Sequence, residues 1–392
     1  MISLKDIFAD TQKAFALKSD SELDWALFLF ELIKRESLVK IGTAFTQFFL
    51  NVHLPVKRLI RATVFDHFCG GVSKKDCQRI IEKMHSKNVY SVLDFSSEGK
   101  NTEEQFDLTM LKTLNNIDFA RDHKAVPFVV FKPSGFGKVD LFEKVSLDLK
   151  LTHLETLQWK RIGERFDTVC QKAQKNRIPL LIDAEESWIQ KAADDLVEQM
   201  MAQYNKHQTI VFCTLQMYRR DRPEYLEYLH QKAVREGFSI GVKLVRGAYM
   251  EKERSRAKQR QFPDPICKDK KTTDHQFNSA LEYVVNHIGQ ISLFAGTHHE
   301  ESCFQLLTLM DKENIKNNNP KIWFGQLYGM SDHISFNLSH RNYNVAKYLP
   351  YGPVREVMPY LIRRAEENTS VAGQMHRELE LIRNEISRRK AV

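Results

Sequence analysis

The 392-residue chain contains no apolar run long enough to cross a membrane. Its longest apolar segments, WALFLFELI at 25–33 and FTQFFLNVHL at 45–54, are much shorter than the ~18 residues that a span needs, and polar residues interrupt them. The first residues, MISLKDIFADTQKAF, have neither the basic start and apolar stretch of a secretory signal nor the Arg-rich, acid-poor composition of a mitochondrial presequence. We therefore expect a cytoplasmic protein, for which any contact with the inner face of a membrane would be peripheral.

Cysteines are few, and positive charge is not concentrated. The six cysteines lie far apart without a CxxC pair, so we expect reduced, mostly buried thiols rather than a disulfide framework. The net charge of +8 is diluted by 50 acidic residues. The densest basic segments, 251–260 and 383–392, alternate in sign or lie at a terminus, which favours solvated helix faces over a nucleic-acid surface. A mild attraction to anionic lipid would explain the excess charge equally well.

From residue 89 onward, eight short apolar runs alternate with longer amphipathic stretches. The runs are 89–96, 127–132, 179–185, 209–218, 240–249, 291–298, 321–329 and 344–352. Apolar strands separated by helices indicate a parallel sheet that is buried on both faces. Eight such units in about 300 residues predict a closed α/β barrel of the (β/α)8, TIM-like type. No GxGxxG turn follows the first strand, which argues against an open dinucleotide-binding sheet.

The segment before residue 89 has a helical period instead. Ser21 and Ser73 precede amphipathic stretches and are candidate N-caps. We therefore predict an N-terminal helical arm over residues 1–85, and a barrel catalytic domain with closing C-terminal helices over residues 86–392.

Polar side chains appear where the predicted strands end. They are Lys132, Asp183 with Glu185, Gln216 with Tyr218, Arg246 with Tyr249, Thr297 with His298, Gln326, and Tyr348. Each alone has a structural explanation, such as a solvated lysine, a helix N-cap or a satisfied core residue. Together they predict an active site, because the C-terminal strand ends of a barrel meet at the catalytic face.

The stretch PYLIRRAEENTS at 359–370 follows the last predicted strand. On a helix, Tyr360, Arg364 and Glu367 share one face, and Arg363 lies close enough for both guanidinium groups to reach one small anion. A surface helix with ion pairs is the structural alternative. Its position after the eighth strand favours a clamp for a carboxylate or phosphate, with Glu367 orienting the arginines.

Several strings in this chain resemble the signatures of proline dehydrogenase in order and spacing. They are FVVFKPSG, LLIDAEES, TLQMYRR, KLVRGAYM, AGTHHEES, GQLYGM, YLPYGP and YLIRRAEEN, and the resemblance covers roughly residues 60 to 380. The family uses FAD to oxidise L-proline to Δ1-pyrroline-5-carboxylate on a distorted (β/α)8 barrel. The resemblance therefore implies FAD as cofactor, L-proline as substrate and no metal.

The resemblance also implies roles for individual residues. The catalytic residues would be Asp183 and Lys243, with the cation of Lys243 near flavin N5. The substrate would contact Lys132, Asp183, Leu244, Tyr249, Tyr348, Tyr360, Arg363, Arg364 and Glu367. The cofactor would contact Ala184, Gln216, Lys243, Arg246, Gly247, Ala248, Thr297 and His298. In this arrangement Arg363, Arg364 and Lys132 pin the carboxylate, so that C5 of proline faces N5 of the flavin.

Three positions depart from the family pattern. Lys243 stands where many bacterial members have Arg, Met217 replaces a small residue, and His299 replaces a common Asn. The lysine resembles the mitochondrial branch and would make a single rather than a forked contact. From the chain length we expect the form of the enzyme that catalyses one reaction. Tyr348 would lie over the proline ring edge, which predicts a preference for proline over hydroxyproline.

The family typically passes its electrons to a membrane quinone, with the aromatic helices at 25–50 as a candidate membrane contact and simple barrel cover as the alternative. The rival enzyme class is a Schiff-base aldolase, since Lys132 or Lys243 could form an imine. A metal-dependent hydrolase is weaker, because His298 and His299 would point to opposite faces of a strand. A nucleic-acid-binding protein is the third class, and it predicts steeply salt-dependent retention on DNA.

Overall fold

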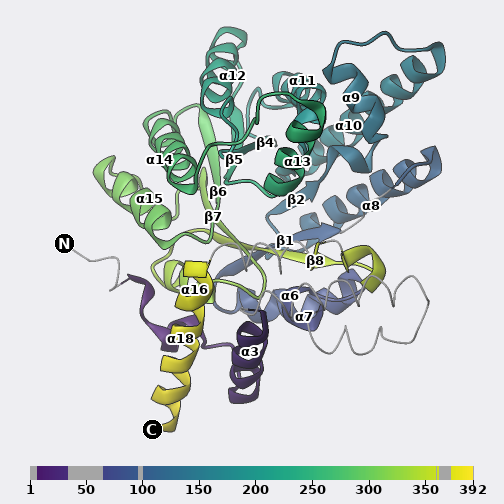
Figure 1. Ribbon diagram of the computed structural model, residues 1–392. Coiled ribbons are helices and arrows are strands. Elements are labelled where there is room, and N and C mark those ends of the chain that lie inside the picture. Colours follow the sequence, from purple (N-terminus) through teal and green to yellow (C-terminus); the bar gives the residue numbers. More distant parts are fainter. Residues whose placement is uncertain (1–6, 34–64, 96–99, 359, 362–371, 392) are drawn as a thin grey trace. The chain divides into compact units, whose positions relative to one another are not determined.

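Eight parallel strands form a closed barrel in sequence order in the computed structural model, which describes residues 7–33, 65–95, 100–358, 360–361 and 372–391 (Figure 1). The strands are β1 (Val89–Phe95), β2 (Phe128–Phe131), β3 (Leu180–Ile182), β4 (Val211–Gln216), β5 (Ile240–Val245), β6 (Ile291–Gly296), β7 (Ile322–Leu327) and β8 (Val345–Tyr351). Each lies inside one of the eight predicted apolar runs, so the (β/α)8 architecture is confirmed.

The chain divides into two compact units. Unit 1 comprises residues 1–96, 298–301 and 325–392, and unit 2 comprises residues 97–297 and 302–324. The predicted division into an arm (1–85) and a barrel domain (86–392) stays a proposal.

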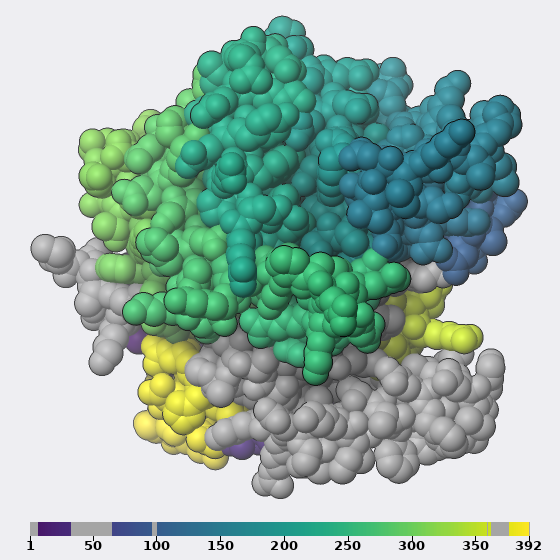
Figure 2. All heavy atoms as spheres, turned by 45° about the horizontal axis from the view of Figure 1, so that its top comes forward, coloured from purple at the N-terminus to yellow at the C-terminus, as the bar shows by residue number. Residues whose placement is uncertain are grey.

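Unit 2 carries β2 to β6 and most of the helices that surround the barrel. They are α8 (Glu103–Asp122), the 3-10 turn η2 (Pro133–Gly135), α9 (Val139–Ser146), α10 (His153–Asn176), α11 (Ser187–Tyr204), α12 (Arg222–Glu236), α13 (Met250–Arg260), α14 (Lys270–Asn286) and α15 (Glu300–Lys312). Helix α8 packs on β2, α11 on β4, and α14 on β5 and β6. These helices make up much of the surface coloured blue to green in Figure 2.

Aromatic side chains fill the core of unit 2. The ring of Phe128 meets those of Phe212, Phe294 and Trp323 edge to face, with ring centroids 5.1 to 5.8 Å apart. Phe212 pairs in register with Gly241 of β5, where an added Cβ would lie 2.5 Å from the Phe212 ring. Because Gly241 has no side chain, the Phe212 ring can pack directly against the backbone of β5.

Unit 1 carries β1 and β8 together with α2 (Thr11–Ala14), α3 (Asp20–Ile33), α6 (Asp66–Phe68), α7 (Lys74–His85), α16 (Asp332–His340) and α18 (Ala372–Lys390). Ser73 caps α7 as predicted, in a capping box with Asp76. The cap predicted at Ser21 is wrong: α3 begins at Asp20, and the Ser19 hydroxyl accepts the Glu22 N–H at 3.2 Å. Ser19 and Ser21 precede the same apolar pattern, and only the backbone geometry shows which of them caps the helix.

The N-terminal and C-terminal helices of unit 1 pack on one another. Phe15, Leu23 and Leu29 share a buried cluster with Leu379 and Ile382 of α18. The guanidinium of Arg389 donates to the backbone oxygens of Phe15 and Lys18 and to Asp20 Oδ1. The two ends of the described chain thus stabilise each other.

All six cysteines are free and buried, as the sequence predicted. Within the described ranges, every helix is too short or too polar to span a bilayer.

Candidate active site

The two predicted catalytic residues lie together at the C-terminal strand ends of unit 2. Lys243 Nζ donates to Asp183 Oδ1 at 2.5 Å, and only 6% of the lysine is exposed. Lys243 lies within β5, and Asp183 directly follows β3, where its N–H donates to Phe131 O at 3.0 Å. A buried cation that pairs with a carboxylate is costly to desolvate and is a common feature of functional sites.

The amide of Gln216 connects the loops that follow β3 and β5. Its Nε2 donates to the Glu185 carbonyl at 2.7 Å, and its Oε1 accepts the Ala248 N–H at 3.2 Å. The residue is 2% exposed. The predicted contact of Gln216 with a flavin stays a prediction. What the geometry adds is that this side chain sets the spacing of Ala248 from the β3 end.

The loop after β5 depends on a glycine. Gly247 has φ +135°, and an added Cβ would lie 2.5 Å from the Tyr218 ring. Tyr218 N–H donates to Arg246 O at 2.7 Å, so the two strand ends also pair through their backbones. The missing side chain therefore lets this loop pack against the Tyr218 ring, and the role of residues 246–248 at a nucleotide cofactor stays a prediction.

Arg246 is held by three elements of unit 2. Its guanidinium donates to Asp274 Oδ1 at 2.6 Å, to Thr297 Oγ1 at 2.6 Å and to Ser302 Oγ at 3.0 Å. Burial would raise the pKa of Asp274, but hydrogen bonds from Lys270 and Arg246 lower it below its usual value. The predicted cofactor residues Arg246 and Thr297 are therefore brought together. Asp274 was not predicted from the sequence, because it lies inside a helical pattern without a motif.

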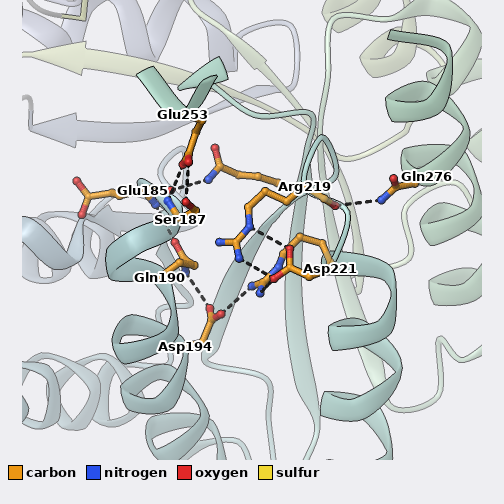
Figure 3. Close-up of polar contacts among 10 residues, drawn as sticks. Glu185, Ser187, Gln190, Asp194, Arg219, Asp221, Glu253 and Gln276 are labelled. Atoms are coloured by element: carbon orange, nitrogen blue, oxygen red, sulfur yellow. Dashed lines mark hydrogen bonds and ion pairs between the residues drawn. The ribbon is translucent and has the colours of Figure 1, made fainter. Parts of the chain in front are cut away.

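A buried chain of polar contacts begins at Glu185 (Figure 3). The Glu185 carboxylate accepts the Ser134 N–H at 2.8 Å and the Ser134 hydroxyl at 2.6 Å, which fixes the turn directly after Lys132. Its own N–H donates to Gln190 Oε1, and Gln190 Nε2 donates to Asp194 Oδ1 at 2.8 Å. Asp194 accepts from Arg222 at 2.7 Å.

Burial raises the pKa of Glu185 to about 7, even though Ser134 and Lys132 both oppose the shift. Lys132 itself is partly buried at the end of β2. From the sequence, Glu185 was predicted only as a polar strand end. Ser134, Gln190 and Asp194 were missed, because a buried network shows itself only when distant segments meet.

A second contact joins the β3 loop to α13. Glu253, with no exposed surface, accepts the Ser187 N–H and the Ser187 hydroxyl, both at 2.6 Å. Lys252 pairs with Glu186 beside it. The end of the β3 loop at Ser187 is thus held by α13 (Figure 3).

In unit 1, the His298 ring contacts one side-chain hydroxyl and one backbone N–H. Its Nδ1 lies 2.8 Å from Ser331 Oγ, and its Nε2 accepts the Leu327 N–H at 3.4 Å. The expectation that His298 and His299 lie on opposite faces of a strand is wrong, because β6 ends at Gly296. Among the described residues, no group of three or more His, Cys, Asp or Glu side chains could hold a metal ion.

The structure describes four of the remaining predicted substrate residues, namely Tyr348, Tyr360, Leu244 and Tyr249. Tyr348 is buried on β8, and its carbonyl accepts the Tyr328 N–H at 2.9 Å. Tyr360 is 7% exposed. Leu244 is buried and, because strand residues alternate, faces the side of β5 opposite to Lys243. Tyr249 is partly buried and precedes α13. Arg363, Arg364 and Glu367 lie outside the described residues.

Known proteins resemble this chain over most of its length. The family model described as proline dehydrogenase matches residues 77–377. The chain is 36% identical to the carbapenem antibiotics biosynthesis protein CarD of Pectobacterium carotovorum, over 82% of this chain and 83% of that protein. It is 29% identical to a hydroxyproline dehydrogenase of Xenopus laevis, over 96% of this chain and 88% of that protein.

A solved structure with a similar fold is proline utilization A (PutA) from Bdellovibrio bacteriovorus. The TM-score is 0.73 and the sequence identity 17%, and the match covers 94% of this chain but only 40% of that chain. At this identity the likeness shows the fold alone, a closed (β/α)8 barrel.

Proposed function

Because the chain belongs to the proline dehydrogenase family, we propose that it oxidises L-proline to Δ1-pyrroline-5-carboxylate with FAD as its cofactor. The observation that carries the proposal, besides the family match, is the buried Lys243–Asp183 pair at the strand ends. When bound, FAD supplies the acceptor for the hydride that leaves C5 of the proline ring.

The residues of unit 2 suit such a cofactor. The cation of Lys243 would stabilise negative charge that arrives at the site during the reaction, and Asp183 keeps that cation in place. The side-chain-free tip at Gly247 and the Arg246–Thr297 contact offer a backbone surface and hydrogen-bonding groups for the nucleotide part.

The substrate carboxylate would be bound by Lys132 together with Arg363 and Arg364. Positive charge next to the amino acid disfavours the ammonium form of proline, so it would promote the deprotonated amine from which a hydride leaves more readily. The contact of Ser134 with Glu185 would hold the Lys132 turn in position for this task.

The decisive experiment replaces Arg363 and Arg364 separately by Met. We expect each variant to raise KM for proline by tenfold or more, on the order of the 1.5–3 kcal/mol of a charge-assisted hydrogen bond, while FAD stays bound. A Lys138→Met variant serves as control, because Lys138 is exposed before α9. Unchanged KM in both arginine variants would refute the carboxylate clamp.

The purified protein distinguishes the rival aldolase directly. A flavin absorbance that bleaches when proline is added supports the proposed reaction. A colourless protein that borohydride attaches covalently to a carbonyl substrate would instead support Schiff-base chemistry at a lysine.

For substrate preference we propose proline over trans-4-hydroxyproline, because the bulky Tyr348 side chain would crowd a ring hydroxyl. The relative named hydroxyproline dehydrogenase makes this a sharp test. Comparable kcat/KM for the two substrates would overturn the preference, and a Tyr348→Ser variant should narrow the ratio.

We propose a membrane quinone as the electron acceptor, with brief peripheral contact of a cytoplasmic protein with the membrane. Trp25, Phe28 and Leu32 of α3 are 37%, 55% and 42% exposed and recur at helical spacing, so they form an apolar stripe. Replacing all three by Ser should weaken binding to anionic vesicles and quinone reduction in vesicles, while activity with a soluble quinone is kept. If the triple variant is as active as the wild-type protein in both quinone assays, α3 does not form the membrane contact.

A further inference from the structure

Ser331 has a backbone conformation that is unusual for its residue type. It has φ +51° and ψ +42°, in the left-handed region, and it directly precedes α16. This conformation is unfavourable for a non-glycine residue, so the surrounding contacts must stabilise it. Ser331 is 3% exposed, and its carbonyl accepts the N–H groups of Ile334 and Ser335 at 3.1 Å.

A buried carboxylate from the C-terminal helix holds this residue. The N–H of Ser331 donates to both Oε1 and Oε2 of Glu378, each at 3.0 Å. Glu378 belongs to α18 and is 6% exposed. Burial raises the pKa of Glu378, and the nearby His333, the Ser331 N–H and the charge of Lys347 oppose that shift. A carboxylate buried against a single backbone N–H is an expensive arrangement to keep for packing alone.

The hydroxyl of Ser331 in turn orients His298. Because the Leu327 N–H donates to Nε2, the neutral imidazole carries its proton on Nδ1 and donates it to Ser331 Oγ at 2.8 Å. The hydrogen-bond pattern thus selects both the tautomer and the plane of the ring.

The loop that contains His298 is fixed from α18 a second time. Glu300 Oε1 lies 3.0 Å from His333 Nε2 of α16 and 3.0 Å from Arg377 Nε, and Arg377 is the neighbour of Glu378. One turn of α18 therefore reaches the His298 ring through Ser331 and the residues that follow His298 through Glu300.

We propose that Ser331 and Glu378 are positioning residues that hold the His298 ring toward the cofactor. Glu378 stabilises the left-handed backbone of Ser331, and Ser331 fixes the tautomer and orientation of His298. The inference rests on the proposed function, in which His298 contacts FAD. It assigns to α18 a part in preparing the cofactor site besides packing on the N-terminal helices.

Two variants test the proposal. Ser331→Gly removes the hydroxyl but relieves the left-handed strain, so it should fold with an unchanged or higher Tm. Glu378→Gln keeps an oxygen for the Ser331 N–H but removes the charge. The matched controls are Asn342→Gly, which relieves strain at another left-handed and exposed residue (φ +63°), and Glu385→Gln, another buried carboxylate of α18 that pairs with Arg388.

The first measurement needs no cofactor. In the FAD-free protein, the ¹⁵N resonances of the His298 ring, identified by their loss in His298→Asn, should show a proton on Nδ1. Ser331→Gly should shift them toward a mixture of tautomers, and Glu378→Gln should move them in the same direction. The two controls should leave them in place.

The second measurement uses the cofactor. Ser331→Gly should weaken the Kd for FAD about tenfold, the lower end of the loss seen when a supporting partner of a metal-binding histidine is removed. Unchanged His298 resonances in a folded Ser331→Gly variant would overturn the inference, and so would equal shifts in the controls. If the wild-type protein binds no FAD, the proposed function fails, while the ring resonances still decide whether Ser331 positions His298.

Discussion

Glu185 should make stability depend on pH in a direction opposite to that of most carboxylates. Burial raises its pKa from 4.5 to about 7, with the charge of Glu186 adding to the shift and Ser134 and Lys132 opposing it. Between these two values the folded chain binds one more proton than the unfolded chain does. The free energy of unfolding therefore falls as pH rises from 4.5 to about 7, and the full loss is present above that range.

The size of this effect follows from the shift. A difference of 2.5 between 4.5 and about 7, at about 1.4 kcal/mol for each pKa unit, is ~3 kcal/mol. Glu185→Gln removes the titration and can still accept the Ser134 N–H. The variant should therefore gain ~3 kcal/mol relative to the wild-type protein as pH rises through this window.

Urea unfolding of both proteins across the same pH range measures the difference. Ser134→Ala is the companion variant, because it removes the hydroxyl that donates to the Glu185 carboxylate at 2.6 Å. Losing that donor should raise the pKa further, so the fall in stability should extend to higher pH. A difference between Glu185→Gln and wild type that stays constant with pH would refute the reasoning, and so would the absence of a protonated-carboxyl band that Glu185→Gln removes from the infrared spectrum.

Three further predictions concern single contacts in unit 2. Lys243→Met leaves Asp183 without its cation and should lower the free energy of unfolding by about 3 kcal/mol. Lys243→Arg keeps the positive charge and should keep most of the wild-type stability. Equal melting temperatures for the two variants would contradict this prediction. Asn205 has no exposed surface and makes four hydrogen bonds to backbone groups near the starts of β4 and β5. Asn205→Ala should therefore lower the free energy of unfolding, measured in urea, by about 3 kcal/mol. A loss below about 1 kcal/mol would be inconsistent with these hydrogen bonds. Gly247→Ala should lower the free energy of unfolding by about 3 kcal/mol and weaken FAD binding. The control is Gly237→Ala, at a left-handed residue with open space around an added Cβ. It should lower the free energy of unfolding by about 1 kcal/mol and leave FAD binding unchanged.

The barrel could be predicted from the sequence because its signal is local. Strands buried on both faces must be apolar almost throughout, and the helices between them must be amphipathic, so the alternation is written into consecutive residues. The same holds for polar strand ends such as Asp183 and Arg246, since parallel topology alone brings the C-terminal strand ends to one edge of the barrel. Lys243 came from the family resemblance instead, and its hydrogen bond to Asp183 at 2.5 Å shows that the two side chains lie together.

The contacts that hold those residues could not be predicted in the same way. Glu378 follows the strand end of His298 by 80 residues, and nothing in the local pattern of either segment indicates that Ser331 joins them. Gln216 was predicted from its motif, but its contact with Ala248 was not. Periodicity therefore determined which residues stand at the strand ends. Only the tertiary structure decided which buried donor meets which acceptor, because that choice depends on distances between segments far apart in the chain, and a hydrogen bond is lost when those distances change by an ångström.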